Sequence, residues 1–510
     1  MNCIELPWFD RRKKQKKTLS IDINSLFPHA MLQKQPVSRY MLHEEGSALI
    51  VAMRKVLQEQ GSVGFCEHYK TYVALTNTYF LLTVKIEYPS HLHAFFDLVP
   101  SFRKRAVGVE ELSDAQLWIM KKMGLKPSFR DPILVSDLHP QTITISFSYL
   151  CLLCSLGVIL CDVSRAMSAF SAPILRDAVG DLLHLKKTAK NDFFRQLSKN
   201  CLNSSYGRMS LQSHSYPDLA VARGRRQITR AMSSSHLLRF KILAPEIVLT
   251  YNQKRMVKCD SLFFIGCSIQ NASKLYVLET YYTIIKARLT RSFIDVSLSL
   301  SCVYCDTDNL VIECHAASFN ECGRLIRTSD ILYEIRDLID FENYLKHFPS
   351  HRIFEELRSR LSEDEFTSLV AEMRRSVGQS GLYKTEHHLG KYSGEITYFY
   401  SLRIKCYLLR SFMQDSADEA AEQSSFKEKR CLKGSILRSR AKNLAEKDYL
   451  QMSDDSDRYL ERNMTKIISK HWQYFMIKIK RYRPHTFDRK RSLVSQESGL
   501  SVPFGYQPPN

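Results

Sequence analysis

The apolar residues of this chain recur with two spacings, which predict both strands and helices. Alternating apolar and polar residues are typical of strands, whereas apolar residues three and four apart are typical of helices. The alternating stretches are residues 18–23, 71–88 and 303–312, and the helical stretches are residues 181–210 and 272–289. Because strands and helices follow in mixed order and the strands lie far apart in sequence, the pattern predicts an α+β fold rather than a doubly wound sheet.

One apolar stretch, ITISFSYLCLLCSLGVIL at residues 143–160, is long enough to raise the alternative of a membrane span. It contains three serines and a threonine, and its first residues alternate before the pattern becomes helical. We therefore expect a buried strand followed by a core helix, and no membrane partner.

The charge of the chain is strongly positive. Its 510 residues include 73 Lys and Arg against 53 Asp and Glu, a formal net charge of +20, and basic residues cluster at 11–17 and 478–491. Such a chain is expected to bind a polyanion, most simply nucleic acid. The alternatives are solvated basic faces and, less favoured, an acidic membrane surface. The length allows two to four domains.

The 14 cysteines show no disulfide-like spacing, and the residues after Met1 do not resemble a signal peptide. A reducing, intracellular compartment is expected, and the basic run 11–17 is compatible with the nucleus. Two C-x-x-C pairs, Cys151/Cys154 and Cys302/Cys305, lie in apolar runs. We interpret them as buried thiols, with a zinc site as the alternative.

Three acids stand at predicted strand ends. Asp306 and Asp308 lie in the turn of VYCDTDNLVI (303–312), and Asp22 ends the strand of SIDINSLFPHAM (20–31). Each alone is typical of a solvated turn or a cap. Together they match what a two-metal phosphoryl-transfer site requires, with Mg²⁺ as the metal that suits carboxylates, phosphates and water.

A helix face in RQLSKNCLNSSYGRMS (195–210) offers groups that suit a nucleotide. At 100° per residue, Arg195, Lys199, Asn203 and Tyr206 fall on the same side. Cations can bind phosphates, and a ring can stack on a base or sugar. The alternative is an ordinary exposed helix face.

These segments resemble motifs of the family B DNA polymerases. DINSLFP resembles D-x-x-S-L-Y-P, KNCLNSSYG matches K-x-x-x-N-S-x-Y-G, and YCDTDN matches Y-x-D-T-D-S except at its last residue. LRIKCYLLRS (402–411) carries the K-x-Y motif, and the segments occur in the family's order. From Asp22 to near Tyr506 the chain is most similar to the protein-primed branch, in particular to polymerases of Polinton/Maverick elements and adintovirus-like viruses.

The resemblance implies a metal site and a nucleotide site. Asp22 and Asp308 would be the principal metal ligands, assisted by the Ile23 carbonyl, with Asp306 in an auxiliary role. Two Mg²⁺ ions are implied, with Mn²⁺ as an alternative. The residues implied to bind the nucleotide are Phe27, Lys190, Lys199, Asn203 and Tyr206, where Phe27 would exclude ribonucleotides.

The resemblance also implies contacts with DNA and a right-hand architecture. Tyr304, Lys405 and Tyr407 would contact the primer strand. The implied fold has an antiparallel-sheet palm at residues 1–45 and 260–410, fingers at 176–215, and a thumb with the C-terminal region at 411–510. Residues 46–175 and 216–259 would be insertions, the first of the processivity type.

Two positions and one missing domain depart from the family pattern. Phe27 replaces a tyrosine, and Asn309 replaces a serine. Only 21 residues precede Asp22, so we expect the family's N-terminal exonuclease domain to be lacking.

The function implied is that of a DNA-templated DNA polymerase replicating a viral or mobile element. Its partners would be primer-template DNA, dNTPs and, in the protein-primed branch, a terminal protein. The alternatives are a catalytically inactive nucleic-acid-binding remnant and another palm polymerase such as a reverse transcriptase. No P-loop pattern is present, which disfavours a helicase or other ATPase.

Overall fold

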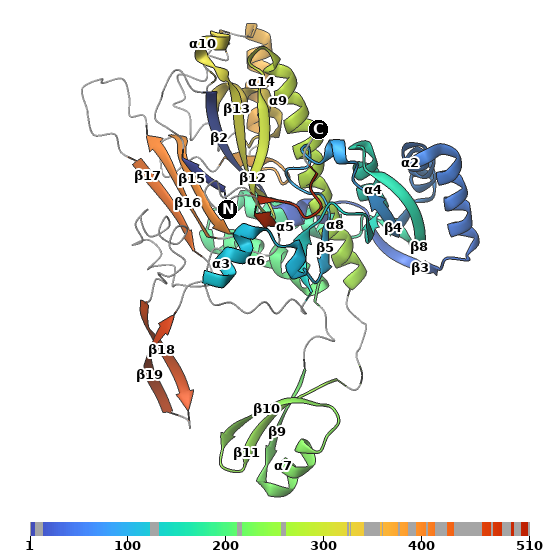
Figure 1. Cartoon of the computed structure of the whole chain (residues 1–510), viewed down its shortest axis with the longest axis vertical. Helices are drawn as coiled ribbons and strands as arrows, with labels where there is room; N and C mark the ends of the chain where they lie inside the picture. The colour runs from blue at the N-terminus through green and yellow to red at the C-terminus, as the bar shows by residue number, and fades with distance from the viewer. Residues whose placement is uncertain are drawn as a thin grey trace.

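The computed structural model (Figure 1) confirms a mixture of helices and antiparallel sheets. The residues that it describes are 2–5, 14–122, 132–211, 217–254, 256, 262–323, 326, 328–340, 358–359, 361–375, 378–385, 394–403, 406–413, 426–432, 462–470, 473–481, 491–493 and 501–507.

The first sheet joins segments that are far apart in the sequence. Its strands lie in the order β12 (Ser299–Asp306), β13 (Asn309–Ser318), β2 (Lys14–Ile23) and β14 (Tyr383–Thr385), all antiparallel. Leu19 and Ile21 of β2 stand opposite Ile312 and Leu310 of β13, and all four are at most 1% exposed. These alternating apolar residues fix the register, because a slip of one residue would turn them away from the core.

Helices cover this sheet and continue from it. Short α1 (Leu26–Met31) follows β2 and contacts α8 (Phe263–Glu279), which runs through a π-helical segment (Thr280–Lys286) into α9 (Ala287–Ser292). The helix predicted at 272–289 therefore begins nine residues earlier. Its apolar residues before 272, such as Ile265 and Ile269, are buried against α1 and its neighbours.

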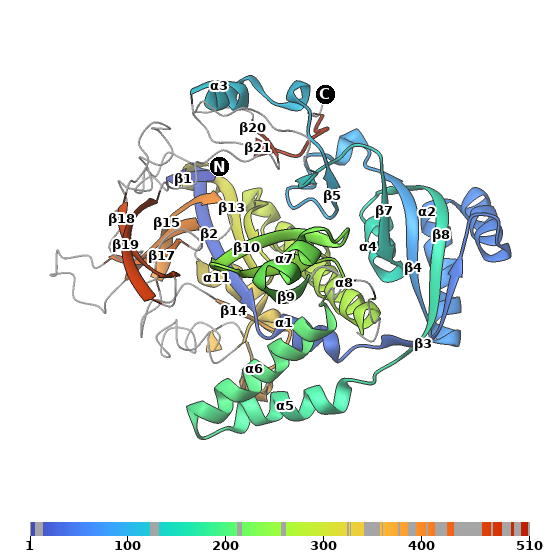
Figure 2. The same cartoon turned by 90° about the horizontal axis from the view of Figure 1, so that it is seen from below.

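The single helix predicted at 181–210 is two helices. They are α5 (Arg176–Thr188) and α6 (Asp192–Met209), which lie side by side next to α1 (Figure 2). Asn191 starts α6, because its side-chain oxygen accepts a hydrogen bond from the backbone N–H of Phe193 at 2.8 Å.

A second sheet lies to the right of the first in Figure 1. Its order is β3 (Gln35–His43), β8 (Ile159–Ala172), β4 (Thr78–Glu87) and β7 (Gln141–Ser146). It packs with α2 (Ala48–Thr76) and α4 (Phe147–Ser155). The prediction of strand at residues 71–76 was wrong. They continue α2, which is held to the core by the rings of Phe65 and Tyr69.

The stretch at 143–160 is confirmed as a strand followed by a core helix, but the strand is only partly buried, since Thr144 is exposed. In α4, every residue from Phe147 to Cys154 except Ser148 is buried. No helix in the described part of the chain is both long enough and apolar enough to cross a membrane.

The C-terminal tail returns to the region of the second sheet. Strands β20 (Ser492–Leu493) and β21 (Ser501–Val502) pair, and Phe504 bridges to Asp137. The nearby elements are β5 (Phe102–Arg105), α3 (Asp114–Lys122) and β6 (Ile133–Ser136). The described residues near the C-terminus thus pack against the predicted insertion 46–175.

Of the remaining sheets, the one that contains β15 packs against the first sheet, whereas the sheet of β9–β11 and the hairpin β18–β19 project away from it in Figure 1. The sheet with β15 has the order β1 (Asn2–Glu5), β15 (Gly394–Arg403), β16 (Cys406–Met413) and β17 (Phe426–Leu432). Another sheet has the order β10 (Leu237–Ala244), β11 (Ile247–Asn252) and β9 (Asp218–Arg223), with helix α7 (Gly224–Met232) beside it. The hairpin pairs β18 (Arg462–Lys470) with β19 (Gln473–Arg481). Strands β3 and β16 do not follow the predicted domain limits. β3 lies within the predicted palm segment 1–45 but pairs with β8, and β16 spans the predicted limit at 410.

The remaining described helices are short or end next to residues outside the described ranges. They are the 3-10 turns Ser90–Leu92, Val109–Glu111, Ile294–Val296 and Arg336–Leu338, and the helices α10 (Phe319–Cys322), α11 (Thr328–Glu334) and α14 (Glu363–Arg375).

The pair Cys151/Cys154 has a third cysteine as neighbour. Cys66 of α2 is buried against α4, and hydrogen bonds from the Cys151 and Cys154 thiols lower its pKa, with help from the charge of Lys70. Within the described residues, no group of three His, Cys, Asp or Glu side chains is arranged to hold a metal ion. Cys151 and Cys154 are both buried, as expected for this pair.

Candidate active site

The predicted acids meet at one end of the first sheet. Asn309 of β13 stands opposite Asp306 of β12 on one side and Asp22 of β2 on the other, and Lys384 of β14 stands opposite Asp22. Residues directly opposite each other in antiparallel strands point to the same face. The four side chains therefore form a polar row across the sheet, which we call the acid row.

Asp308 reaches the acid row through the hairpin turn. The backbone N–H of Ile23 donates to the Asp308 carbonyl at 2.9 Å, and the N–H of Asp308 donates to the Asp306 carbonyl at 2.8 Å. The turn requires Thr307 at a φ of +69°, which is unfavourable for a β-branched residue. Ser25, just beyond β2, also has a positive φ, of +53°. Such strained residues gather at functional sites.

The Asp22 carboxylate is engaged by a cation in this structure. The ammonium of Lys384 lies 2.5 Å from its Oδ2, and the Asp22 side chain is 14% exposed. As the side chains stand, the described acids do not form a three-ligand metal group. The oxygen chemistry of the row nonetheless suits Mg²⁺, which prefers carboxylates together with water and phosphate.

Lysines from three elements converge beside the acid row. Lys186 of α5 donates to the Ser25 hydroxyl at 2.7 Å. Burial lowers the pKa of Lys186, and the nearby charges of Lys199 and Lys384 lower it further. The convergence of like charges next to the acids suits a polyanionic ligand such as a triphosphate.

Phe27 and Tyr206 are brought together as the nucleotide-site prediction requires. Their rings stack with centroids 4.1 Å apart and planes 13° apart, which joins α1 to α6. Both rings are partly buried and pack beside Leu202 and Ile269. Phe27 follows Asp22 by five residues, so its ring is carried close to the acid row.

The other predicted nucleotide residues lie on or next to α6. Lys199 and Asn203 are exposed on α6, and Lys190 is exposed in the loop between α5 and α6. Arg195, on the same face, pairs with Asp192 at 2.9 Å. The charge of Lys199 acts on Lys186, so Lys199 belongs to the lysine cluster. Lys190 is exposed in the loop between α5 and α6.

The predicted primer contacts are partly assembled. Tyr304, two residues before Asp306, is 7% exposed and lies edge-on to Tyr407 of β16, with ring centroids 5.4 Å apart. Both rings contact Phe399 of β15. Lys405 lies outside the described residues.

Lys186 and Lys384 were not among the predicted site residues. Lys384 belongs to the three-residue strand Tyr383–Thr385, in which its two neighbours are buried while its own side chain faces the acid row. A polar residue between two buried ones is a common strand pattern, so only the pairing of β14 with β2 reveals its role.

Comparison with solved structures finds phi29 DNA polymerase. The chain is similar to the polymerase complexed with primer-template DNA (12% identity, TM-score 0.46, 95% of this chain and 61% of that chain). It is similar to the orthorhombic crystal form (12%, 0.47, 94% and 61%) and to the ternary complex with primer-template DNA and incoming nucleotides (12%, 0.44, 94% and 60%). The chain therefore spans about three fifths of these polymerase chains. No protein-family model and no curated protein matches the chain.

Proposed function

We propose that the chain is a DNA-templated DNA polymerase of the family B type, which adds dNMP to a primer 3′-hydroxyl. The observation that carries the proposal is the acid row, in which Asp22 and Asp306 flank Asn309 while Asp308 occupies the adjoining strained turn. Two motifs far apart in sequence supply its acids, Lys186 lies near the charges of Lys199 and Lys384, and Phe27, five residues after Asp22, stacks on Tyr206.

In this proposal the acid row binds two Mg²⁺ ions, with Mn²⁺ as an alternative. Asp22 and Asp308 are the principal ligands, with the Ile23 carbonyl, and Asp306 assists. When bound, the ions would activate the primer hydroxyl and neutralise the triphosphate and the leaving oxygen. Lys384 must then release Asp22 and becomes available, with Lys186 and Lys199, to the phosphates.

The other residues orient the reactants. Asn203 and Tyr206 shape the nucleotide pocket, and Phe27 occupies the space that a ribose 2′-hydroxyl would need. Tyr304, Tyr407 and Lys405 hold the primer strand. Fixed positions of this kind favour in-line attack on the α-phosphate.

The domain assignment follows the same proposal. The first sheet, built from both 1–45 and 260–410, would be the palm, and the α5–α6 pair the fingers. Residues 46–175 and 216–259 would be insertions, and residues 411–510 the thumb and C-terminal region. Primer-template DNA and dNTPs are the proposed partners, and a terminal protein is proposed as the primer in the natural reaction of a viral or mobile element.

A second candidate is nucleic-acid binding without catalysis. The observation that favours it is the ion pair of Lys384 with Asp22, which engages a proposed metal ligand. Nothing in the geometry favours a reverse transcriptase in the same way.

Primer extension separates the two candidates. The protein is incubated with a primed DNA template, dNTPs and Mg²⁺, beside the variant Asp308→Asn, while DNA affinity is measured for both by fluorescence anisotropy. Extension by the wild type alone, with equal DNA binding, supports the polymerase. Binding without extension by either protein supports the second candidate.

A further inference from the structure

The Asp97 carboxylate connects the second region of the molecule to the strand that carries Asp306. It lies in the loop between β4 and β5, and its side chain is 14% exposed. Its Oδ2 accepts hydrogen bonds from the backbone N–H of Cys302 at 2.7 Å and from the Tyr281 hydroxyl. Its Oδ1 accepts from the Leu98 N–H at 2.9 Å. The carboxylate is therefore held by several donors at once.

The donors other than Cys302 make Asp97 rigid. Tyr281 and Tyr282 are consecutive residues of the π-helical segment, and the Tyr282 hydroxyl also lies 3.3 Å from Oδ1. Burial raises the pKa of both tyrosines, and the Asp97 charge raises it further, so they stay hydroxyl donors. The Lys286 ammonium lies 3.3 Å from Oδ1 and compensates the charge. π-Helical turns are rare and occur frequently at functional sites.

The bond to Cys302 falls at the irregular point of β12. The pairing of β12 with β13 shifts register between Cys302 and Tyr304, and regular pairing then continues to Asp306. Among the described strands, β12 is also at the edge of this sheet, where the outward N–H of Cys302 bonds to Asp97 and not to another described strand. Asp97 supplies the acceptor that such a strand would provide.

The position of this bulge decides where Asp306 points. Bulges re-aim the side chains that follow them, and a shift by one residue exchanges the two faces of a strand. With the bulge between Cys302 and Tyr304, Asp306 stands opposite Asn309 and joins the acid row, while the ring of Tyr304 reaches Tyr407.

We propose that Asp97 is a positioning residue of the acid row, which fixes the bulge of β12 through Cys302 and so sets the placement of Tyr304 and Asp306. The inference rests on the proposed function, because it treats Asp306 as part of the metal site. The inference gives the region 46–175 an indirect role in catalysis, because its Asp97 carboxylate holds β12, the strand that carries Asp306.

The test compares Asp97→Asn with the matched control Asp137→Asn. Asp137 is a fully buried carboxylate of the same region, and it is held by Arg105 at 2.6 Å and His139 at 2.7 Å. Thermal unfolding and primer extension over a range of Mg²⁺ concentrations are measured for both. Both variants are expected to unfold at lower temperature. Only Asp97→Asn is expected to raise the Mg²⁺ concentration for half-maximal extension, by about tenfold, because small displacements at a reacting centre have large effects.

Two tyrosine variants test the route through Cys302. Tyr281→Phe removes the hydroxyl that shares Oδ2 with Cys302, and we expect roughly a threefold higher Mg²⁺ requirement from the looser carboxylate. Tyr282→Phe removes a hydroxyl that donates to the Leu98 carbonyl at 2.5 Å and lies 3.3 Å from Oδ1, not Oδ2, and is expected to stay near the wild type. If Asp97→Asn does not fold, the Tyr281→Phe variant is the deciding test. An unchanged Mg²⁺ requirement in Tyr281→Phe then overturns the inference.

The outcomes distinguish this inference from the proposed function. A wild type that binds primed DNA without extending it overturns the proposed function, and the inference with it. A wild type that extends primers, with equal Mg²⁺ requirements in Asp97→Asn and Asp137→Asn, overturns the inference alone.

Discussion

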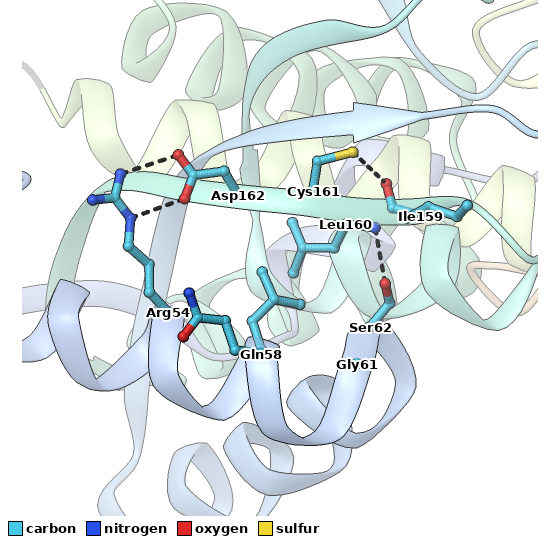
Figure 3. A pocket seen from close by; sticks show the side chains of 9 residues that line it. Arg54, Gln58, Gly61, Ser62, Ile159, Leu160, Cys161 and Asp162 are labelled. Carbon is cyan, nitrogen blue, oxygen red and sulfur yellow. Dashed lines mark hydrogen bonds and ion pairs between the residues drawn. The ribbon is translucent and has the colours of Figure 1, made fainter.

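Two polar sites on two sheets of this protein differ in how their charges are satisfied. A pocket of about 320 Å³ lies beside β8 of the second sheet, where α2 is kinked at Gly61 (Figure 3). In it, Arg54 donates to both oxygens of Asp162 at 2.9 and 3.0 Å and also binds Glu45 at 2.7 Å. Asp162, the acid that lines this pocket, thus has a cation partner that holds both of its oxygens.

The acid row of the first sheet is built differently. Its acids lie in register across strands, Asp308 follows Thr307 with its positive φ, Lys384 pairs with Asp22, and Lys186 of α5 lies near the charges of Lys199 and Lys384. In the proposed function these acids and lysines bind metal ions and phosphates, whereas the Arg54–Asp162 pair of the pocket joins α2 to β8. Under that proposal, the register of the strands marks the site and the pocket does not.

The largest effect is expected from removing a charge of the acid row. Asp22→Asn or Asp308→Asn should lower primer extension roughly 10³-fold or more, because a lost metal ligand removes several kcal/mol of transition-state stabilisation. Asp162→Asn, in the pocket, is the matched control and should stay within a few-fold of the wild type. Single-nucleotide extension rates measure this, and equal losses in both sites would remove the distinction between them.

The lysine cluster should give the next largest effect. Lys199→Ala removes a charge-assisted phosphate contact worth about 1.5–3 kcal/mol, so kcat/KM for dNTP should fall roughly 10- to 100-fold. Lys190→Ala, in the exposed loop between α5 and α6, is the control and should change less. Steady-state incorporation kinetics decide, and an unaltered kcat/KM in Lys199→Ala would show that α6 does not meet the nucleotide.

The parts of the site that were predictable are local in sequence. The two-residue spacing of Asp306 and Asp308 predicted a hairpin, and it is one, with strands Ser299–Asp306 and Asn309–Ser318. The face of α6 was predictable because helical periodicity fixes it. The resemblance placed Asp22 with the other acids, and the register of β2 with β13 brings them together.

What was missed depends on pairing between distant segments. Residues 71–76 alternate as a strand would, yet packing of Phe65 and Tyr69 upstream extends α2 through them. The pairing of β3 with β8, and of β14 with β2, has no signal within the short segments themselves. Asp97 is an acid in a loop, and only the fold reveals that it bonds to β12.

A smaller effect is expected for sugar selection at Phe27. Phe27→Ala should admit ribonucleotides, lowering the preference for dNTP over rNTP roughly tenfold or more, because pocket shape discriminates small groups by about that factor. Phe27→Tyr keeps the ring that stacks on Tyr206 and is the control. Incorporation of rNTP and dNTP opposite the same template base measures it, and unchanged discrimination in Phe27→Ala would place the sugar elsewhere.

The smallest effect should come from the ion pair of Lys384 with Asp22, which makes the acid row resemble the pocket. Lys384 competes with a metal ion for Asp22, and an ion pair with a partly exposed partner is worth roughly 0.2–1 kcal/mol. Lys384→Met should therefore lower the Mg²⁺ concentration for half-maximal extension by up to about fivefold, while raising KM for dNTP if the lysine turns to the phosphates. Titrating Mg²⁺ at saturating dNTP separates the two effects. A higher Mg²⁺ requirement in the variant would mean that Lys384 holds Asp22 in its productive position, so that in both sites the ion pair serves structure.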